Sequence, residues 1–176
     1  MKSFLLCCCM LITVSGFAQG SGNIFVVRHA EKESDAPDTP LSDKGRSRAA
    51  CLAQTLKDAH ISAVLTSQYI RTKQTAAPIT ELAHAHAESF DAKAALQIAA
   101  AAQEAAKSGN VLIVGHSNTI PQLMSALGAP SVSIPDSSFD QLFIVNASEP
   151  KQMAIVHYCP ALPAENVTHP QSSMAK

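Results

Sequence analysis

The chain carries little charge and has almost no excess of one sign. Aspartate, glutamate, lysine and arginine make up 15% of its 176 residues, and the formal net charge is −1. Nucleic acids and anionic membrane surfaces attract proteins through fields of clustered positive charge. Because this composition lacks such a field, we expect no nucleic-acid partner, and any recognition of an anion has to be local.

The sequence also lacks an apolar run long enough for a membrane-spanning helix, which takes about 20 residues. The apolar run from Phe4 to Val14 is shorter, follows Lys2 and precedes the small-x-small sequence Gly16-Phe17-Ala18. This order is typical of a bacterial-type secretory signal peptide over residues 1–18. We therefore expect cleavage after Ala18 and a soluble mature protein, secreted or periplasmic, with no membrane span.

Cysteine becomes scarce once that segment is removed. Three cysteines, at 7–9, lie in the apolar run, and the bulky Leu6 before them disfavours lipidation. After cleavage only Cys51 and Cys159 would remain. An exported chain meets an oxidising compartment, so these two could form a disulfide if their Cα atoms lie within about 7 Å. Two buried free thiols are the alternative.

Internal repeats are absent as well, and short apolar runs alternate with helical patterns. Strands are expected at 24–27, 63–65, 87–90, 111–114, 143–145 and 153–156, and helices at about 42–58, after Ser67, at about 93–107 and at about 119–127. Such alternation is typical of a mainly parallel sheet with helices on both faces, and the last two strands indicate an antiparallel edge. The prediction is an α/β protein, a three-layer α/β/α sandwich with a mainly parallel mixed sheet. It forms one domain over 19–160, with a flexible tail at 161–176.

Two of the predicted strands end at a histidine. One runs into Arg28-His29-Ala30-Glu31 and another into Gly115-His116-Ser117-Asn118. Ligands of open α/β sheets bind beyond the carboxyl ends of such strands. Arginine offers a planar fork of donors suited to phosphate, and a neutral imidazole is a nucleophile near neutral pH. One strand-end histidine could simply satisfy a loop, but two matched strand ends favour a shared site for phosphoryl transfer.

A third segment, Ser67-Gln68-Tyr69-Ile70-Arg71-Thr72-Lys73-Gln74-Thr75-Ala76, follows the apolar run at 63–65. Together these segments resemble the marks of the histidine phosphatase superfamily, also called the phosphoglycerate mutase-like family, in the family's order. Those marks are an Arg-His-Gly strand end, a Ser-x-x-x-Arg-x-x-x-Thr-Ala helix start and a later Gly-His strand end. The resemblance runs from about Ile24 to Val145 and includes Leu41-Ser42-Asp43-Lys44-Gly45-Arg46, in which Ser42 is also a credible helix N-cap.

This resemblance implies a phosphoglycerate mutase-like fold and a catalytic core of four residues: His29, His116, Arg28 and Arg71. The first histidine is expected to attack phosphorus and form a phosphohistidine that water hydrolyses. The arginines and the second histidine would stabilise the charge that develops on the phosphoryl oxygens. No cofactor or metal is expected, because the remaining histidines, such as the pair at 84 and 86, lack a third ligand at suitable spacing.

The further residues expected to contact the substrate are Ser67, Ser117 and Glu31. Helix capping is the stronger explanation of Ser117. The general acid stays open, because the interval in which many family members supply a glutamate is short here. The candidates are Glu31, Glu88 and Asp91. Glu31 could equally be a solvated partner of Lys32, and Asp91 is expected to cap the following helix.

Two residues depart from the family pattern. Ala30, where the family usually has glycine, is a small change. The departure that counts against a glycolytic mutase is Asp35, which lies where mutase-type members carry an asparagine that contacts phosphate, and the expected export and the missing insertion point the same way. The sequence therefore predicts a secreted, metal-independent phosphomonoesterase that acts on a small phosphorylated substrate. The alternative is a catalytically feeble phosphoryl-binding or regulatory module of the same fold. The sequence leaves the substrate and the oligomeric state open.

Overall fold

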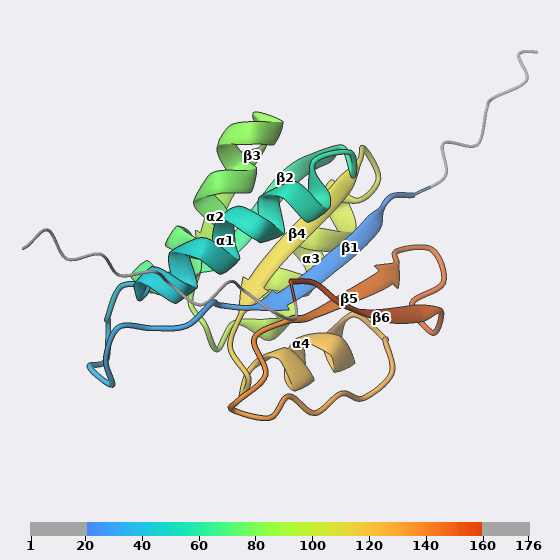
Figure 1. The fold of residues 1–176 in the computed structure, drawn as a ribbon. Helices are drawn as coiled ribbons and strands as arrows, with labels where there is room; N and C mark the ends of the chain where they lie inside the picture. The colour runs from blue at the N-terminus through green and yellow to red at the C-terminus, as the bar shows by residue number, and fades with distance from the viewer. Residues whose placement is uncertain (1–20, 160–176) are drawn as a thin grey trace, which may run out of the picture.

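A computed structural model describes residues 21–159 (Figure 1). The predicted signal peptide, its cleavage site and the predicted tail lie outside these residues. The described elements, in chain order, are β1 (Asn23–Arg28), α1 (Asp43–Leu56), β2 (Ile61–Ser67), α2 (Ile70–Ala83), β3 (His86–Phe90), α3 (Ala95–Ala105), β4 (Asn110–Gly115), α4 (Ile120–Ala126), β5 (Gln141–Asn146) and β6 (Met153–His157).

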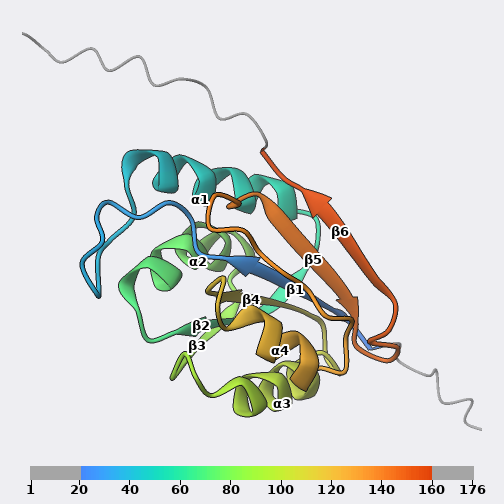
Figure 2. The same ribbon diagram turned by 90° about the horizontal axis from the view of Figure 1, so that it is seen from below.

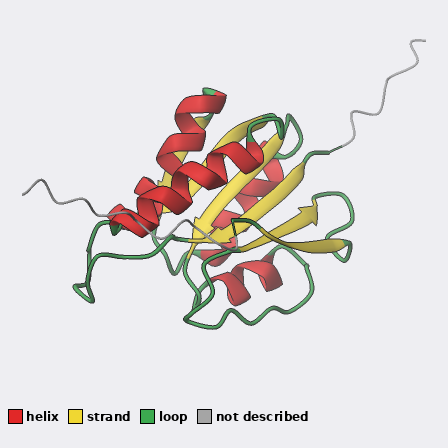
Figure 3. Cartoon of the chain, viewed as in Figure 1, coloured by secondary structure: helices red, strands yellow, loops and turns green. Residues whose placement is uncertain are grey.

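The strands form one six-stranded sheet in the order β3-β2-β4-β1-β5-β6. The first four of these are mutually parallel, whereas β5 pairs antiparallel with β1, and β6 antiparallel with β5. Figure 2 shows α1 and α2 on one side of this sheet and α3 and α4 on the other, and Figure 3 shows the same three layers by element type. The predicted three-layer α/β/α fold with an antiparallel edge is confirmed.

The direction of each crossover decides which face a helix covers. The chain moves outward from β1 to β2 and β3, then returns inward to β4, and right-handed crossovers place the helices of the outward and return steps on opposite faces. Each face therefore has its own core. Phe25, Val27 and Leu112 point toward α1 and α2, while Ile24, Val26 and Ile113 pack with α3 and α4.

Among the four described helices, a side-chain N-cap is present on α1 alone. Ser42 caps α1, as predicted, because its hydroxyl accepts a hydrogen bond from the Gly45 amide at 3.1 Å. Asp91, by contrast, does not cap α3. That helix starts after Ala94 without a side-chain cap, and the Asp91 carboxylate instead accepts from the Lys93 amide at 2.8 Å in the turn before it.

The sheet order brings two distant strand ends together. β1 and β4 are neighbours, with Arg28 opposite Gly115, and the His29 amide extends the ladder by donating to the Gly115 carbonyl at 2.9 Å. Because the strands are parallel, the residues that follow them, His29 and His116, emerge at the same edge of the sheet. No helix in the described part of the chain is both long and apolar enough to cross a membrane.

Candidate active site

A pocket of about 560 Å³ opens at the carboxyl ends of β1 and β4. The loop 31–40, the start of α2 and the loop 128–140 complete its walls. Its lining residues are Arg28, His29, Lys32, Asp35, Ala36, Pro37, Arg71, His116, Ser117, Asn118, Asp136 and Phe139. The four residues predicted as the catalytic core therefore share one cavity of a size typical of small-molecule sites.

His29 is held as a neutral imidazole with one free nitrogen. Its Nδ1 lies 2.8 Å from the Ala30 carbonyl oxygen, which can only accept, so Nδ1 carries the proton and Nε2 keeps its lone pair. Burial, with a smaller contribution from the nearby charges of Arg71 and Arg28, lowers the pKa of His29 to about 4, although the hydrogen bond to Ala30 acts in the opposite direction. At neutral pH this side chain is therefore an unprotonated nucleophile facing cations.

His116 has both ring nitrogens engaged. Nε2 lies 2.8 Å from the Ser67 hydroxyl, and Nδ1 lies 3.4 Å from Nη2 of Arg71, which can only donate. In the neutral ring Nδ1 therefore accepts and Nε2–H donates to Ser67, whose hydroxyl contacts that of Thr72 at 2.9 Å. Burial, then the neighbouring His29, lowers the pKa of His116 to about 3. The two imidazole centroids are 5.1 Å apart.

Arg28 is bonded on one side and open on the other. Its Nη1 donates to the carbonyl oxygens of Pro135, Asp136 and Ser138, at 3.1, 2.8 and 3.3 Å. The Phe139 ring stacks on the guanidinium, with its centroid 4.1 Å from Cζ. The buried Nε–H has no hydrogen-bond partner among residues 21–159. One edge of the fork is therefore fixed to the loop. The other makes no hydrogen bond to the described residues, although Nη2 lies 3.8 Å from the Asp136 carboxylate.

Arg71 shows the same division of its donors. Nη1 donates to the Pro37 carbonyl at 2.9 Å, and the guanidinium lies over the Tyr69 ring at 4.3 Å. Its Nε–H is also buried, and the described residues offer it no acceptor. Unsatisfied buried donors are costly and rare. Two of them on the walls of one pocket indicate that it is built for an anion.

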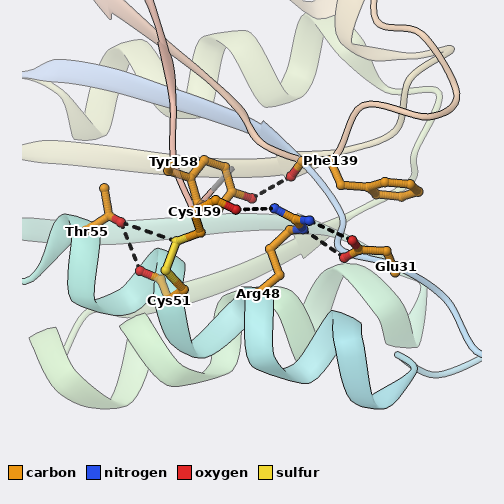
Figure 4. Close-up of a disulfide and its surroundings, with 7 residues drawn as sticks. All are labelled: Glu31, Arg48, Cys51, Thr55, Phe139, Tyr158 and Cys159. Atoms are coloured by element: carbon orange, nitrogen blue, oxygen red, sulfur yellow. Dashed lines mark hydrogen bonds and ion pairs between the residues drawn. A yellow bond between two sulfur atoms is a disulfide. The ribbon is translucent and has the colours of Figure 1, made fainter. Parts of the chain in front are cut away.

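Glu31 lies outside the pocket, contrary to the expectation that it contacts substrate or solvent. Both of its carboxylate oxygens accept hydrogen bonds from Arg48 of α1, at 2.7 and 2.8 Å (Figure 4). The Lys44 ammonium lies 3.4 Å from the same carboxylate. Burial raises the pKa of Glu31, but the bonds and charge of Arg48 outweigh this, so the pKa lies below its usual value. This carboxylate is ionised and occupied, and it cannot serve as a general acid.

A disulfide links α1 to the end of the described chain, next to Arg48. Cys51 on α1 and Cys159 are bonded, with Cα atoms 6.4 Å apart, which resolves the alternative that the sequence left open. The Cys159 carbonyl accepts from Arg48 at 3.2 Å, and the neighbouring Tyr158 hydroxyl donates to the Phe139 carbonyl at 3.0 Å (Figure 4). The end of the described chain thus supports both Arg48 and the ring beneath Arg28.

Of the two serines predicted to contact substrate, one lines the pocket and the other is buried behind it. Ser117 lines the pocket and does not cap α4, whose N-cap is Thr119; its hydroxyl instead donates to the Asp136 carboxylate at 3.1 Å. Ser67 is buried behind His116 and is not part of the lining. Its bond to the imidazole makes it a positioning residue.

Sequence patterns gave no role to three side chains: Asp136 and Phe139, which line the pocket, and Tyr69, whose ring packs against His116 and Arg71. The first two lie in an irregular loop far along the chain from the histidine motifs, and only the fold brings them to Arg28. The other candidate acid, Glu88, lies on edge strand β3, outside the pocket. Among residues 21–159, no three His, Cys, Asp or Glu side chains are grouped so that they could hold a metal ion.

Comparison with known proteins agrees with this geometry. The sequence profile of the histidine phosphatase superfamily (branch 1) matches residues 24–92, and no curated protein matches the chain significantly in sequence. The structure resembles the candidate phosphohistidine phosphatase SixA from Nakamurella multipartitia, with a TM-score of 0.58 and 22% identity over 79% of this chain and 97% of that one.

Two further solved structures have the same fold at lower identity. A mycobacterial glucosyl-3-phosphoglycerate phosphatase is 12% identical over 78% of this chain and 98% of its own, with a TM-score of 0.54. A phosphoserine phosphatase from Entamoeba histolytica, in complex with 3-phosphoglyceric acid, is 13% identical over 78% and 96%, with a TM-score of 0.57. The matched profile thus covers the segments that carry His29 and Arg71, and the solved structures share the fold that the sequence predicted.

Proposed function

We propose that this protein is a metal-independent phosphomonoesterase that acts through a phosphohistidine on His29. The observation that carries the proposal is the pairing of a neutral imidazole, whose Nε2 lone pair is free, with two buried guanidinium Nε–H donors that the described residues leave without an acceptor. A phosphate dianion satisfies both donors, and its phosphorus is the electrophile that the free nitrogen requires.

In the first step, Nε2 of His29 forms a bond to phosphorus while the bond from phosphorus to the leaving oxygen breaks. Arg28 and Arg71 bind the non-bridging oxygens, where charge develops, and a low-dielectric wall strengthens these contacts. The bound dianion favours protonation of His116, so that Nδ1–H joins the donors around the phosphoryl group. In the second step, water attacks phosphorus, the bond to nitrogen breaks and phosphate leaves.

Export belongs to the same proposal. The leader-like pattern at 1–18 supports it, and so does the disulfide between Cys51 and Cys159, since such bonds persist in oxidising compartments. A periplasmic or secreted phosphatase of this kind would meet small phosphorylated compounds. The mass of the N-terminus of the exported protein tests this part: processing to Gln19 is expected, and an intact leader would contradict it.

The chemical part is tested by hydrolysis of p-nitrophenyl phosphate in the presence of EDTA. His29→Ala is expected to lower kcat by about 1,000-fold or more, because the nucleophile is lost. His86→Ala serves as the matched control, since this histidine is exposed on β3. Loss of wild-type activity in EDTA, restored by a divalent ion, would contradict the mechanism.

The intermediate has a separate test. Brief incubation of the wild type with a 32P-labelled phosphomonoester is expected to leave an acid-labile, base-stable label, which His29→Ala lacks. Equal labelling of both proteins would remove His29 as the nucleophile. Turnover of good leaving groups alone, with no natural monoester hydrolysed, would favour the binding-module alternative.

A further inference from the structure

The proposed reaction needs a proton donor for the leaving oxygen, and the pocket restricts the choice. Glu31 is bound to Arg48, and Glu88 and Asp91 lie outside the lining. The carboxylates among the lining residues that the structure describes are Asp35 and Asp136. A general acid must reach the substrate oxygen with a carboxyl that is not held elsewhere.

Asp35 is held elsewhere. Its carboxylate accepts from Lys32 at 2.7 Å, and this bond lowers the pKa of Asp35. An ionised carboxylate in a local ion pair on loop 31–40 is a poor proton donor.

From this geometry we infer that Asp136 is the catalytic acid and base of the reaction, an inference that rests on the proposed function. Its Oδ1 lies 3.8 Å from Nη2 of Arg28, the guanidinium whose open edge binds phosphate, so the carboxyl is next to the expected phosphoryl group. The Ser117 hydroxyl donates to the same Oδ1 at 3.1 Å, which leaves Oδ2 without a hydrogen bond to the described residues and free to carry a proton.

The loop that carries Asp136 is anchored, although the side chain itself is exposed. Its own carbonyl accepts from Arg28 at 2.8 Å, and the carbonyls of Pro135 and Ser138 bind the same Nη1. The phosphate-binding arginine therefore also sets the position of the acid. This is the pre-organisation that proton transfer requires.

A bound phosphomonoester dianion provides the reason for protonation. It brings like charge to the carboxylate and neutralises Arg28, and both changes favour the acid form. The other titratable or charged groups on the pocket walls are His29, Lys32, Asp35, Arg71 and His116. The carboxyl gives its proton to the leaving oxygen as the oxygen–phosphorus bond breaks. The carboxylate then takes a proton from the water that attacks the phosphohistidine, and the cycle closes.

The test compares leaving groups. For Asp136→Asn, which keeps the shape and an acceptor for Ser117, kcat/KM on an alkyl phosphomonoester such as glycerol 2-phosphate is expected to fall by about 100-fold or more, in the range of general acid catalysis. The loss should shrink to within about tenfold for p-nitrophenyl phosphate, whose leaving group needs little protonation. The wild-type to variant ratio on glycerol 2-phosphate should also decline as pH rises.

Asp35→Asn is the matched comparison, and it should change both substrates by the same factor. An equal loss on both substrates for Asp136→Asn, or a selective loss in Asp35→Asn, would overturn the inference. Failure of the proposed function looks different: the wild type itself would then release no p-nitrophenol and form no phosphoenzyme.

Discussion

The two histidines of the pocket differ in which ring nitrogen is free. A main-chain carbonyl decides this for one of them, and a hydroxyl decides it for the other. The Ala30 carbonyl fixes the proton of His29 on Nδ1 and frees Nε2. The Ser67 hydroxyl instead occupies Nε2 of His116 and leaves Nδ1 toward Arg71. The motifs predict that these residues meet, but not which nitrogen is free, because the deciding contacts are set by backbone geometry.

The lowered pKa of both histidines predicts that acid destabilises the fold. In the unfolded chain they take up protons near pH 6.5, whereas in the native state they do so only near pH 4 and pH 3. The unfolded state therefore binds more protons as pH falls below about 6.5, and stability is lost in that direction. Between pH 7.5 and 5.0 we expect a loss of about 2 kcal/mol for each histidine, measured by urea unfolding. His29→Gln should remove about half of this pH dependence, and an unchanged slope in the His29→Gln, His116→Gln double variant would contradict the prediction.

The positions of the strands and helices were predictable from the sequence. The contacts by which these elements hold the site residues in place were not. Periodicity, β-branched runs and Ser42 located β1, β4 and α1 to within a few residues. The pairing of Glu31 with Arg48 escaped prediction, because these residues are 17 apart and only the packing of α1 beneath the loop joins them. Gly45 shows how tight this packing is, since a Cβ there would meet the Glu31 carbonyl. The glycine at this position is part of the segment 41–46 that resembles the family pattern. Its presence is thus explained by the close approach of α1 to the loop that follows His29.

The contact of α1 with this loop gives a prediction about the buried pair. Arg48→Ala leaves the Glu31 carboxylate ionised and largely buried without its partner, which should cost about 3–5 kcal/mol of unfolding free energy. The double variant Glu31→Gln, Arg48→Met removes both charges and should be considerably more stable than Arg48→Ala, because no buried charge is left alone. Chemical denaturation of the three proteins measures this. If the double variant were no more stable than Arg48→Ala, the pair would not act as a coupled unit.

Across the whole molecule, the disulfide joins the two sides of the pocket through the end of the described chain. Cys159 contacts Arg48 of α1, and Tyr158 contacts Phe139, whose ring lies against Arg28. One covalent link thus supports the segment after His29 and the loop that carries Asp136. The sequence supplied the two cysteines, but their pairing depends on β6 returning along the sheet edge to α1, which no local pattern encodes.

Breaking this link should weaken both the fold and the site. The bond joins residues 108 apart in the chain, and cross-linking so long a loop removes conformational entropy from the unfolded state. The chain-entropy model gives about 5 kcal/mol for a loop of this length. Dithiothreitol, or the Cys51→Ser, Cys159→Ser double variant, should lower the free energy of unfolding by roughly that amount. At temperatures where the variant stays folded, kcat should also fall, since the segment after His29 and the loop that carries Asp136 lose support. Dithiothreitol should have no effect on the double variant, which separates reduction of this bond from other actions of the reagent. A reduced protein with unchanged unfolding free energy and unchanged kcat would show that neither the fold nor the site depends on the bond.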